Sequence, residues 1–283
     1  MSGTGLIQEQ VVQKTRVSLR KGAIAYVRKG QGEPVLLIHG MPTSVFLWRN
    51  VIPLLAQDFT VCALDLLGYG DSDRPSKADL SVPAQAEYVA EFMMKVGLTH
   101  ATIVGHDVGG GVAQLLAVDH PELVRRLILI DTVAYDSWPV PEIERFKEPA
   151  WDPKTVDLRE GFKELLLRGI FHKERVTDAL AGEYISTFVG SQGREAYLRC
   201  ARALNSRDIL IRAAEIERMS VPVLIIWGEA DDFYNVVTGQ RLADRLPSAR
   251  LVVVKDAGHF VPEDQPEEVA RLVRAFMKGT TSL

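Results

Sequence analysis

The sequence predicts an α/β protein, built on a mostly parallel, doubly wound sheet with an inserted helical cap. Six short apolar runs recur along the 283 residues, helical patterns lie between several of them, and one central stretch lacks strands. Apolar runs without polar alternation are typical of strands buried on both faces, as in a parallel sheet. Strands that alternate with helices favour a doubly wound arrangement.

The predicted strands follow one another in a regular order. Residues 11–27 come first, alternate in polarity and contain Gly22, which favours an antiparallel hairpin at the edge of the sheet. The apolar runs are Val35–Ile38, Val61–Leu64, Thr102–Val104, Leu127–Ile130, Val223–Trp227 and Leu251–Val254.

Three helices are predicted around this sheet. Residues 84–96 carry Ala86, Val89, Ala90, Met93 and Met94 on one stripe, as expected of a helix packed on a sheet. Residues 112–118 and 266–277 have similar patterns. The last of these begins with proline followed by two glutamates, which suits the first turn of a helix.

Residues 137–212 interrupt the alternation of strands and helices. Four prolines come first, and a helix-rich, strand-poor stretch follows over residues 162–168, 175–184 and 194–204. We expect a helical cap over the carboxyl edge of the sheet, where open α/β sheets place their ligand sites. The core domain would then consist of residues 1–136 and 213–283.

Composition excludes several classes of protein. The formal net charge is −4 and both signs are spread along the chain, so we expect neither nucleic acid nor a membrane surface as a partner. The two cysteines, Cys62 and Cys200, do not form a disulfide scaffold pattern. No signal peptide and no apolar run of about 20 residues is visible, so we expect a cytoplasmic protein, monomer or homodimer.

The strongest motif is Gly105-His106-Asp107-Val108-Gly109, which lies between a predicted strand and a predicted helix. It has the form of a nucleophile elbow, a strained turn whose flanking glycines avoid collision with the adjacent strand and helix. The backbone N–H of Val108 could bind an oxyanion at the helix N-terminus. Taken alone, the motif leaves an alternative, in which Asp107 only caps the helix.

Further motifs favour the nucleophile over the alternative that Asp107 only caps the helix. Residues 36–42 read LLIHGMP, residues 65–72 read DLLGYGDS, residues 226–231 read IWGEAD and residues 256–260 read DAGHF. Together they resemble the α/β-hydrolase superfamily over nearly the whole chain outside the cap. The order nucleophile, acid, histidine is that of the fold. An aspartate at the elbow is similar to the branch of epoxide hydrolases and haloalkane dehalogenases, and residues 39–53 resemble the dehalogenases.

The resemblance implies a covalent mechanism that agrees with simple chemistry. A carboxylate is ionised at pH 7 and needs no base, and its attack on a saturated carbon gives an alkyl ester. His259 would activate a water against the Asp107 ester, and Asp231 would orient His259. The backbone N–H groups of Met41 and Val108 would hold the oxyanion.

The position of the acid has two alternatives. Asp232 follows Asp231 directly, and Asp131 follows the strand at 127–130. Some dehalogenases resemble the arrangement with an acid at the latter place. Asp231 is the preferred assignment.

The sequence departs from the dehalogenases where they cradle the leaving halide. The resemblance would place an Asn at position 41 and a Trp at position 108, but Met41 and Val108 cannot donate hydrogen bonds from their side chains. A cap tryptophan, Trp138 or Trp151, could supply one donor. Packing is the alternative role for each.

Opening of an epoxide needs an acid instead, and epoxide hydrolases use cap tyrosines for this. The candidates are Tyr184 and Tyr197, with Tyr135 at the entry of the cap. A tyrosine is neutral at pH 7 and can still give up its proton. Each could equally be a packed or surface aromatic residue.

The sequence therefore predicts a hydrolase that forms an aspartyl ester, in the first place an epoxide hydrolase acting on a small apolar molecule. A dehalogenase without the usual halide cradle is the first alternative. A non-catalytic ligand-binding relative is the second. No cofactor and no metal is expected, since metal-ligand spacing is absent.

Overall fold

The computed structural model describes residues 13–148 and 157–280. They form an eight-stranded sheet of order β1-β2-β4-β3-β5-β6-β7-β8, in which β2 is antiparallel to both of its neighbours, β1 and β4, and all other neighbouring strands are parallel. The strands are β1 (Thr15–Ser18), β2 (Ala23–Lys29), β3 (Pro34–Ile38), β4 (Thr60–Leu64), β5 (Ala101–His106), β6 (Val124–Ile130), β7 (Val223–Gly228) and β8 (Ala249–Val254). The predicted α/β fold class and the edge hairpin are confirmed.

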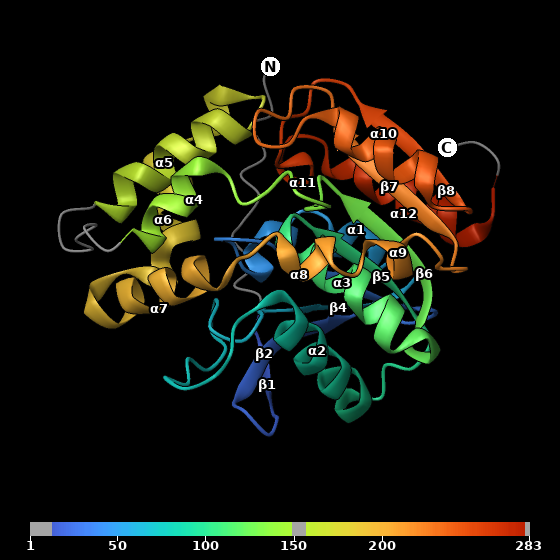
Figure 1. Cartoon of the computed structure of the whole chain (residues 1–283), viewed down its shortest axis with the longest axis horizontal. Coiled ribbons are helices and arrows are strands. Elements are labelled where there is room, and N and C mark those ends of the chain that lie inside the picture. The colour runs from blue at the N-terminus through green and yellow to red at the C-terminus, as the bar shows by residue number, and fades with distance from the viewer. Residues whose placement is uncertain (1–12, 149–156, 281–283) are drawn as a thin grey trace, which may run out of the picture.

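Helices connect the strands of this sheet, and several of them cover its faces (Figure 1). They are α1 (Ile52–Leu55), α2 (Val82–Val96), α3 (Val108–Asp119), α4 (Pro141–Glu144), α5 (Leu158–Gly169), α6 (Asp178–Ile185), α7 (Gly190–Ala203), α8 (Arg207–Leu210), α9 (Ala213–Ile216), α10 (Val236–Arg245), α11 (Val261–Asp264) and α12 (Pro266–Lys278).

Local signals in the sequence set the ends of the long helices. Ser81 caps α2 with its side chain, and Gly97 ends the helix in the left-handed conformation that favours glycine. In α12, Pro266 opens the first turn and Gly279 ends the helix in the same way. The helices predicted over 84–96 and 266–277 are therefore present with slightly wider bounds.

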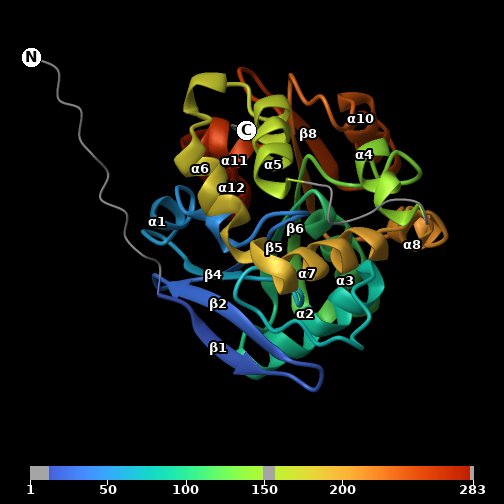
Figure 2. The same ribbon diagram turned by 90° about the vertical axis from the view of Figure 1, so that its left-hand side faces the viewer.

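The chain between β6 and β7 contains α4 to α9 and, within the described residues, no strand. Helices α4 to α7 lie together on the left of the molecule in Figure 1, the side that faces the viewer in Figure 2. Their amphipathic faces are buried through residues such as Phe162, Leu166, Tyr184 and Tyr197. Of the four prolines that open the predicted cap, Pro149 and Pro153 lie outside the described residues.

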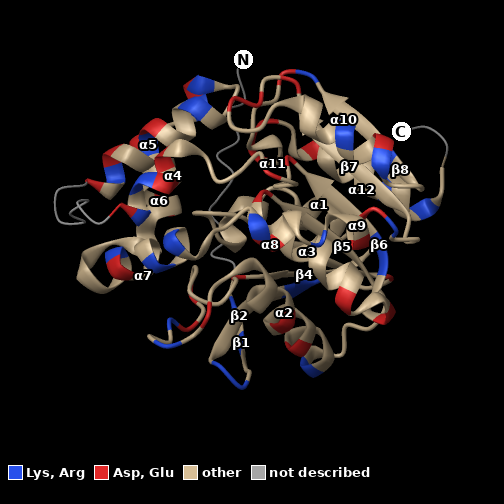
Figure 3. Ribbon diagram, viewed as in Figure 1, with Lys and Arg blue, Asp and Glu red and all other residues tan. Residues whose placement is uncertain are grey.

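One strand differs from the sequence prediction in its burial. The apolar run at 251–254 indicates a strand covered on both faces, but β8 is the last strand of the sheet and Val253 in it is 44% exposed. The inner strands β3 and β5 to β7 are buried almost throughout. Positive and negative residues are interspersed along the ribbon (Figure 3), in keeping with the small net charge.

Candidate active site

Four candidate residues follow the carboxyl ends of neighbouring strands. Asp107 follows β5, Asp131 follows β6, Asp231 lies just beyond β7, and His259 lies beyond β8. These strands are adjacent and parallel, so their carboxyl ends meet at one edge of the sheet. The fold thus brings together residues that are up to 152 positions apart.

Asp107 occupies a strained turn between β5 and α3. Its φ of +52° lies in the left-handed region that side chains rarely adopt. A methyl group on Gly105 would come within 2.4 Å of the Gly109 carbonyl oxygen, and one on Gly109 within 2.4 Å of the backbone oxygens of Ile38 and His39. Both flanking glycines are therefore required, as the motif indicates. Asp107 makes no N-cap hydrogen bond in the described chain; its carboxylate meets the amide of Val108, the first residue of α3.

The two oxygens of the buried Asp107 carboxylate have different partners. Oδ2 accepts from the backbone N–H of Met41 at 2.8 Å, and Oδ1 accepts from the Tyr234 hydroxyl at 3.0 Å. Burial raises the pKa of Asp107, against the charge of His259 and the hydrogen bonds of Val108 N–H, Met41 N–H and Tyr234. One oxygen therefore lies in a backbone cradle, and the other meets a side-chain donor.

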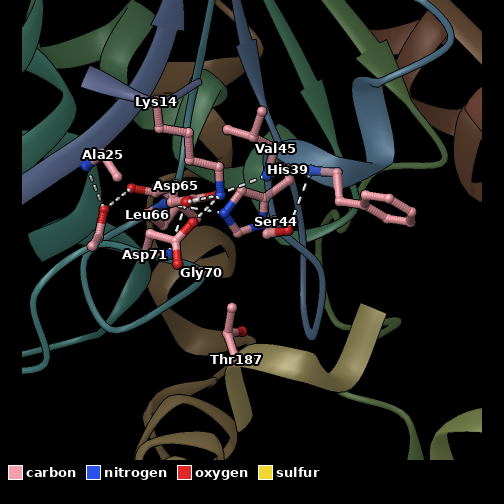
Figure 4. A network of polar contacts seen from close by, with 12 residues as sticks. Lys14, Ala25, His39, Ser44, Val45, Asp65, Leu66, Gly70, Asp71 and Thr187 are labelled. Atoms are coloured by element: carbon pink, nitrogen blue, oxygen red, sulfur yellow. Dashed lines mark hydrogen bonds and ion pairs between the residues drawn. The ribbon is translucent and has the colours of Figure 1, made fainter. Parts of the chain in front are cut away.

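A polar network holds the loop that carries Met41 (Figure 4). Asp65 accepts from the backbone of Val45 at 2.7 Å and from Lys14 Nζ at 2.7 Å. His39 Nε2 accepts from the backbone of Leu66 at 3.0 Å. Burial lowers the pKa of His39 to about 4, so its ring is neutral and can accept that bond. His39 thus joins the loop after β3 to the loop after β4.

His259 pairs with Asp231. Its Nδ1 lies 3.0 Å from Asp231 Oδ2, which assigns the proton to Nδ1 and leaves Nε2 to accept another. Burial alone would lower the pKa of His259, but the charge and hydrogen bond of Asp231 and the charge of Asp107 outweigh it, so the pKa is raised. The ring lies against Phe233, Tyr234 and Phe260 at centroid distances of 5.1 to 5.2 Å.

The three candidate acids have different surroundings. The Asp231 side chain is fully buried and also accepts from the backbone of Phe233 at 2.8 Å. Asp131 is buried too; its Oδ1 accepts from Gly228 N–H at 2.8 Å, and its Oδ2 has no hydrogen-bond partner among the described residues. Burial and the charge of Asp231 raise the pKa of Asp131 well above its usual value. Asp232 is exposed. The contact with His259 belongs to Asp231.

A mostly apolar cavity lies against Asp107 and His259. Of its described lining residues, three have side chains that can exchange protons or donate hydrogen bonds: Asp107, Tyr234 and His259. The remaining lining residues are Met41, Pro42, Val108, Pro139, Val140, Ile143, Leu165, Leu204, Phe233 and Phe260. The cavity therefore suits a small apolar molecule that meets the reactive groups at one end.

The predicted cap tyrosines do not line this cavity in the described part of the chain. The Tyr184 hydroxyl donates to Glu263 Oε1, and the Tyr135 hydroxyl donates to Glu217 at 3.2 Å. The ring of Tyr197 packs against Phe188 with a centroid distance of 5.5 Å.

Of the two candidate tryptophans, the structure describes only Trp138. The indole Nε1 of Trp138 is buried and has no hydrogen-bond partner in the described residues. Trp151 lies outside the described residues.

Sequence reasoning missed Tyr234. The tyrosines expected to donate a proton lie in or beside the predicted cap, whereas Tyr234 belongs to the predicted core domain and follows Asp231 by three residues. The available signal was its place in a loop at the carboxyl end of a strand, where ligand-site residues gather.

The described residues contain no group of three or more His, Cys, Asp or Glu side chains that could hold a metal ion. Among them, no helix is both long enough and apolar enough to cross a membrane.

This chain is similar to known α/β hydrolases. The family described as alpha/beta hydrolase fold matches residues 33–169. Haloalkane dehalogenase 2 of Mycobacterium tuberculosis is 31% identical over 264 residues, which are 89% of this chain and 91% of that protein. The soluble epoxide hydrolase of Corynebacterium sp. is 30% identical over 268 residues, covering 86% and 90%. The solved structure of the epoxide hydrolase CorEH is 27% identical, with a TM-score of 0.82 over 94% of this chain and 99% of the other.

Proposed function

Because this chain belongs to the α/β-hydrolase superfamily, in its epoxide hydrolase and haloalkane dehalogenase-like branch, we propose that it is a hydrolase whose nucleophile is Asp107. One observation carries the proposal: the buried Asp107 carboxylate places Oδ2 on the Met41 N–H and Oδ1 beside a cavity that also contains His259. This is the geometry that an aspartyl-ester cycle requires.

In the first step, Oδ1 of Asp107 attacks a saturated carbon of the substrate. The carbon–oxygen bond forms as the bond to the leaving group breaks, and an alkyl ester remains on Asp107. The apolar walls exclude water from the carboxylate, and the turn holds it in one orientation.

In the second step, His259 takes a proton from a water molecule that attacks Cγ of the ester. Oδ2 carries the developing negative charge and already accepts from Met41 N–H at 2.8 Å. Asp231 holds the His259 ring through Nδ1 and stabilises its positive charge. Esterification removes the charge of Asp107, which is one of the contributions that raise the pKa of His259. A larger fraction of His259 is therefore neutral in the ester state, and the neutral ring is the form that can act as the base.

The substrate we propose is a small apolar epoxide. A departing halide ion would need hydrogen-bond donors, and neither Met41 nor Val108 has one in its side chain. Each missing donor costs roughly 2–4 kcal/mol of transition-state stabilisation. The oxygen of an epoxide stays attached to the product as an alkoxide and takes its proton from solvent, so no separate ion has to be held.

Dehalogenation is the second candidate, and Trp138 is the observation that favours it. Its indole N–H is buried and has no partner in the described chain, and the next residue, Pro139, lines the cavity. The similarity to haloalkane dehalogenase 2 points in the same direction.

A trapped intermediate would test the proposal and separate the two substrates. His259→Gln is incubated with 1,2-epoxybutane or 1-bromobutane, and the peptide that contains Asp107 is weighed by mass spectrometry. We expect an added mass equal to the whole epoxide, and an added butyl group in place of a proton if the halide is the substrate. Asp107→Asn is the control and should carry no adduct. Absence of an adduct with a panel of small epoxides and haloalkanes contradicts the proposal and leaves a non-catalytic binding protein.

A further inference from the structure

Tyr234 contacts the oxygen that the proposed cycle converts into an ester oxygen. Its hydroxyl donates to Asp107 Oδ1 at 3.0 Å, while Oδ2 accepts from Met41 N–H at 2.8 Å. The backbone donor marks Oδ2 as the oxygen that carries negative charge in the tetrahedral intermediate. Oδ1 is therefore the atom that attacks the substrate and later leaves with the product alcohol.

The surroundings of Tyr234 fix its hydroxyl near Oδ1. Its backbone N–H donates to Asp231 Oδ1 at 3.0 Å, and its carbonyl accepts from Trp227 Nε1 at 2.9 Å. The next residue, Asn235, caps α10 with its side chain. The buried ring lies edge-on to His259 at 5.2 Å between centroids. A donor held this firmly can act without first being ordered.

This position suits the second half-reaction and not the first. In a displacement at saturated carbon, the leaving group departs on the side opposite the attacking oxygen. Tyr234 contacts the attacking oxygen, so it lies on the near side of the reacting carbon. In ester hydrolysis the bond that breaks joins Cγ of Asp107 to Oδ1, and the departing oxygen is the one beside Tyr234.

We propose that Tyr234 is a catalytic acid that protonates the departing product oxygen when the Asp107 ester is hydrolysed. This inference rests on the proposed aspartyl ester and holds for an epoxide or a halide as substrate. Water adds to Cγ and gives a proton to His259. The Cγ–Oδ1 bond then breaks, its electron pair goes to Oδ1, and Oδ1 takes the Tyr234 proton to complete the alcohol.

The proton balance then closes within the site. The new carboxyl group of Asp107 holds the oxygen that came from water, in the position that Oδ1 has left. It ionises and returns a proton to the Tyr234 phenolate, which restores the hydrogen bond of the resting site. His259 releases its proton to solvent.

The charge state of Asp107 controls the stage of the cycle at which Tyr234 is most acidic. In the resting site, burial and the negative charge of Asp107 hold the pKa of Tyr234 well above its ordinary value. The ester is neutral, so the second contribution disappears once the ester has formed. Tyr234 is then a stronger acid at the stage where the alkoxide needs a proton, and a phenol remains more acidic than the alcohol it protonates.

Rapid-quench mass spectrometry of the Asp107 peptide measures ester formation and breakdown separately. With 1-bromobutane or 1,2-epoxybutane, Tyr234→Phe should slow ester breakdown by roughly 100-fold, which is a typical contribution of a general acid to a rate. The rate of ester formation should change by less than about threefold. Tyr88→Phe is the matched control, because the Tyr88 hydroxyl donates to the Asp79 carbonyl beside α2. Both rates should stay unchanged in that variant.

A less basic product oxygen should reduce the defect. The probe 1-bromo-4,4,4-trifluorobutane yields a less basic alkoxide than 1-bromobutane, so breakdown in Tyr234→Phe should fall less with it. If Tyr234 had only a structural role, formation and breakdown would slow together, and equally for the two probes. That result overturns the proposal. Breakdown at the wild-type rate also overturns it and assigns the proton to His259.

Two further measurements keep the outcomes distinct. If His259→Gln gains an adduct on Asp107 while Tyr234→Phe breaks its ester down normally, only the role of Tyr234 fails. If no adduct forms in either variant, the aspartyl ester itself fails. Should Tyr234→Phe not fold, 3-fluorotyrosine at position 234 keeps the shape with a more acidic phenol. The alkaline limb of ester breakdown should then move to lower pH, and an unmoved limb contradicts the proposal.

Discussion

Asp264 joins the loop of His259 to the chain that follows α5, and its replacement should weaken both. The Asp264 carboxylate accepts from the backbone N–H groups of Gly258 at 2.9 Å, Phe171 at 2.9 Å and His172 at 3.0 Å. Asp264 is 2% exposed. Three amides from two distant segments thus depend on one side chain.

The expected loss of stability in Asp264→Ala follows from these contacts. A hydrogen bond to a charged group contributes roughly 1.5–3 kcal/mol, and a buried donor left without a partner costs about 1–3 kcal/mol. Gly258 is buried, so its amide should show the full loss, whereas Phe171 is 40% exposed and its amide should lose less. We expect the free energy of unfolding to fall by roughly 3–5 kcal/mol in total, a large part of the 5–15 kcal/mol that is usual for a folded protein.

Urea unfolding followed by far-ultraviolet circular dichroism measures this loss. Asp244→Ala is the control, because Asp244 is exposed on α10 and its replacement should change the free energy of unfolding by less than about 0.5 kcal/mol. Ester breakdown in Asp264→Ala should also slow, since Gly258 precedes His259. A loss below about 1 kcal/mol with unchanged breakdown would refute the reasoning, because it would mean that the three amides find other partners.

The buried ionisable groups give three further predictions. Asp131→Asn keeps the acceptor for Gly228 N–H, so the free energy of unfolding near pH 4, where Asp131 is protonated, should stay within about 1 kcal/mol of wild type. The raised pKa of Asp131 means that the folded state binds more protons than the unfolded state, so wild type should lose stability relative to Asp131→Asn as pH rises above about 3.9; equal slopes in urea titrations would contradict this. Ester breakdown needs neutral His259 and should fall as pH decreases through the pKa of His259 in the ester. The charge of Asp231 raises that pKa, so Asp231→Asn should shift this limb to lower pH in a pH–rate profile. Tyr184→Phe removes the bond to Glu263 and should cost about 1–2 kcal/mol in thermal or urea unfolding, while the rate of ester formation changes by less than about threefold; a larger loss of rate would restore Tyr184 as the epoxide acid.

The sequence by itself determined the fold class and the order of the candidate residues. Apolar runs and helical stripes depend on neighbours within a few positions, so the strands at 35–38 and 127–130 and the helix at 84–96 are readable from local pattern alone. The elbow is equally local, because glycines at 105 and 109 record a steric requirement of the turn.

Only the tertiary structure decided which groups meet. Asp131 and Asp231 both follow strands, and the contact at 3.0 Å between His259 and Asp231 depends on how the loops beyond β7 and β8 pack. Tyr184 lies in the predicted cap and contacts Glu263, whereas Tyr234, from the core, contacts Asp107. These contacts join residues 28, 79 and 127 positions apart, so they follow from packing of whole elements and leave no signal in local sequence.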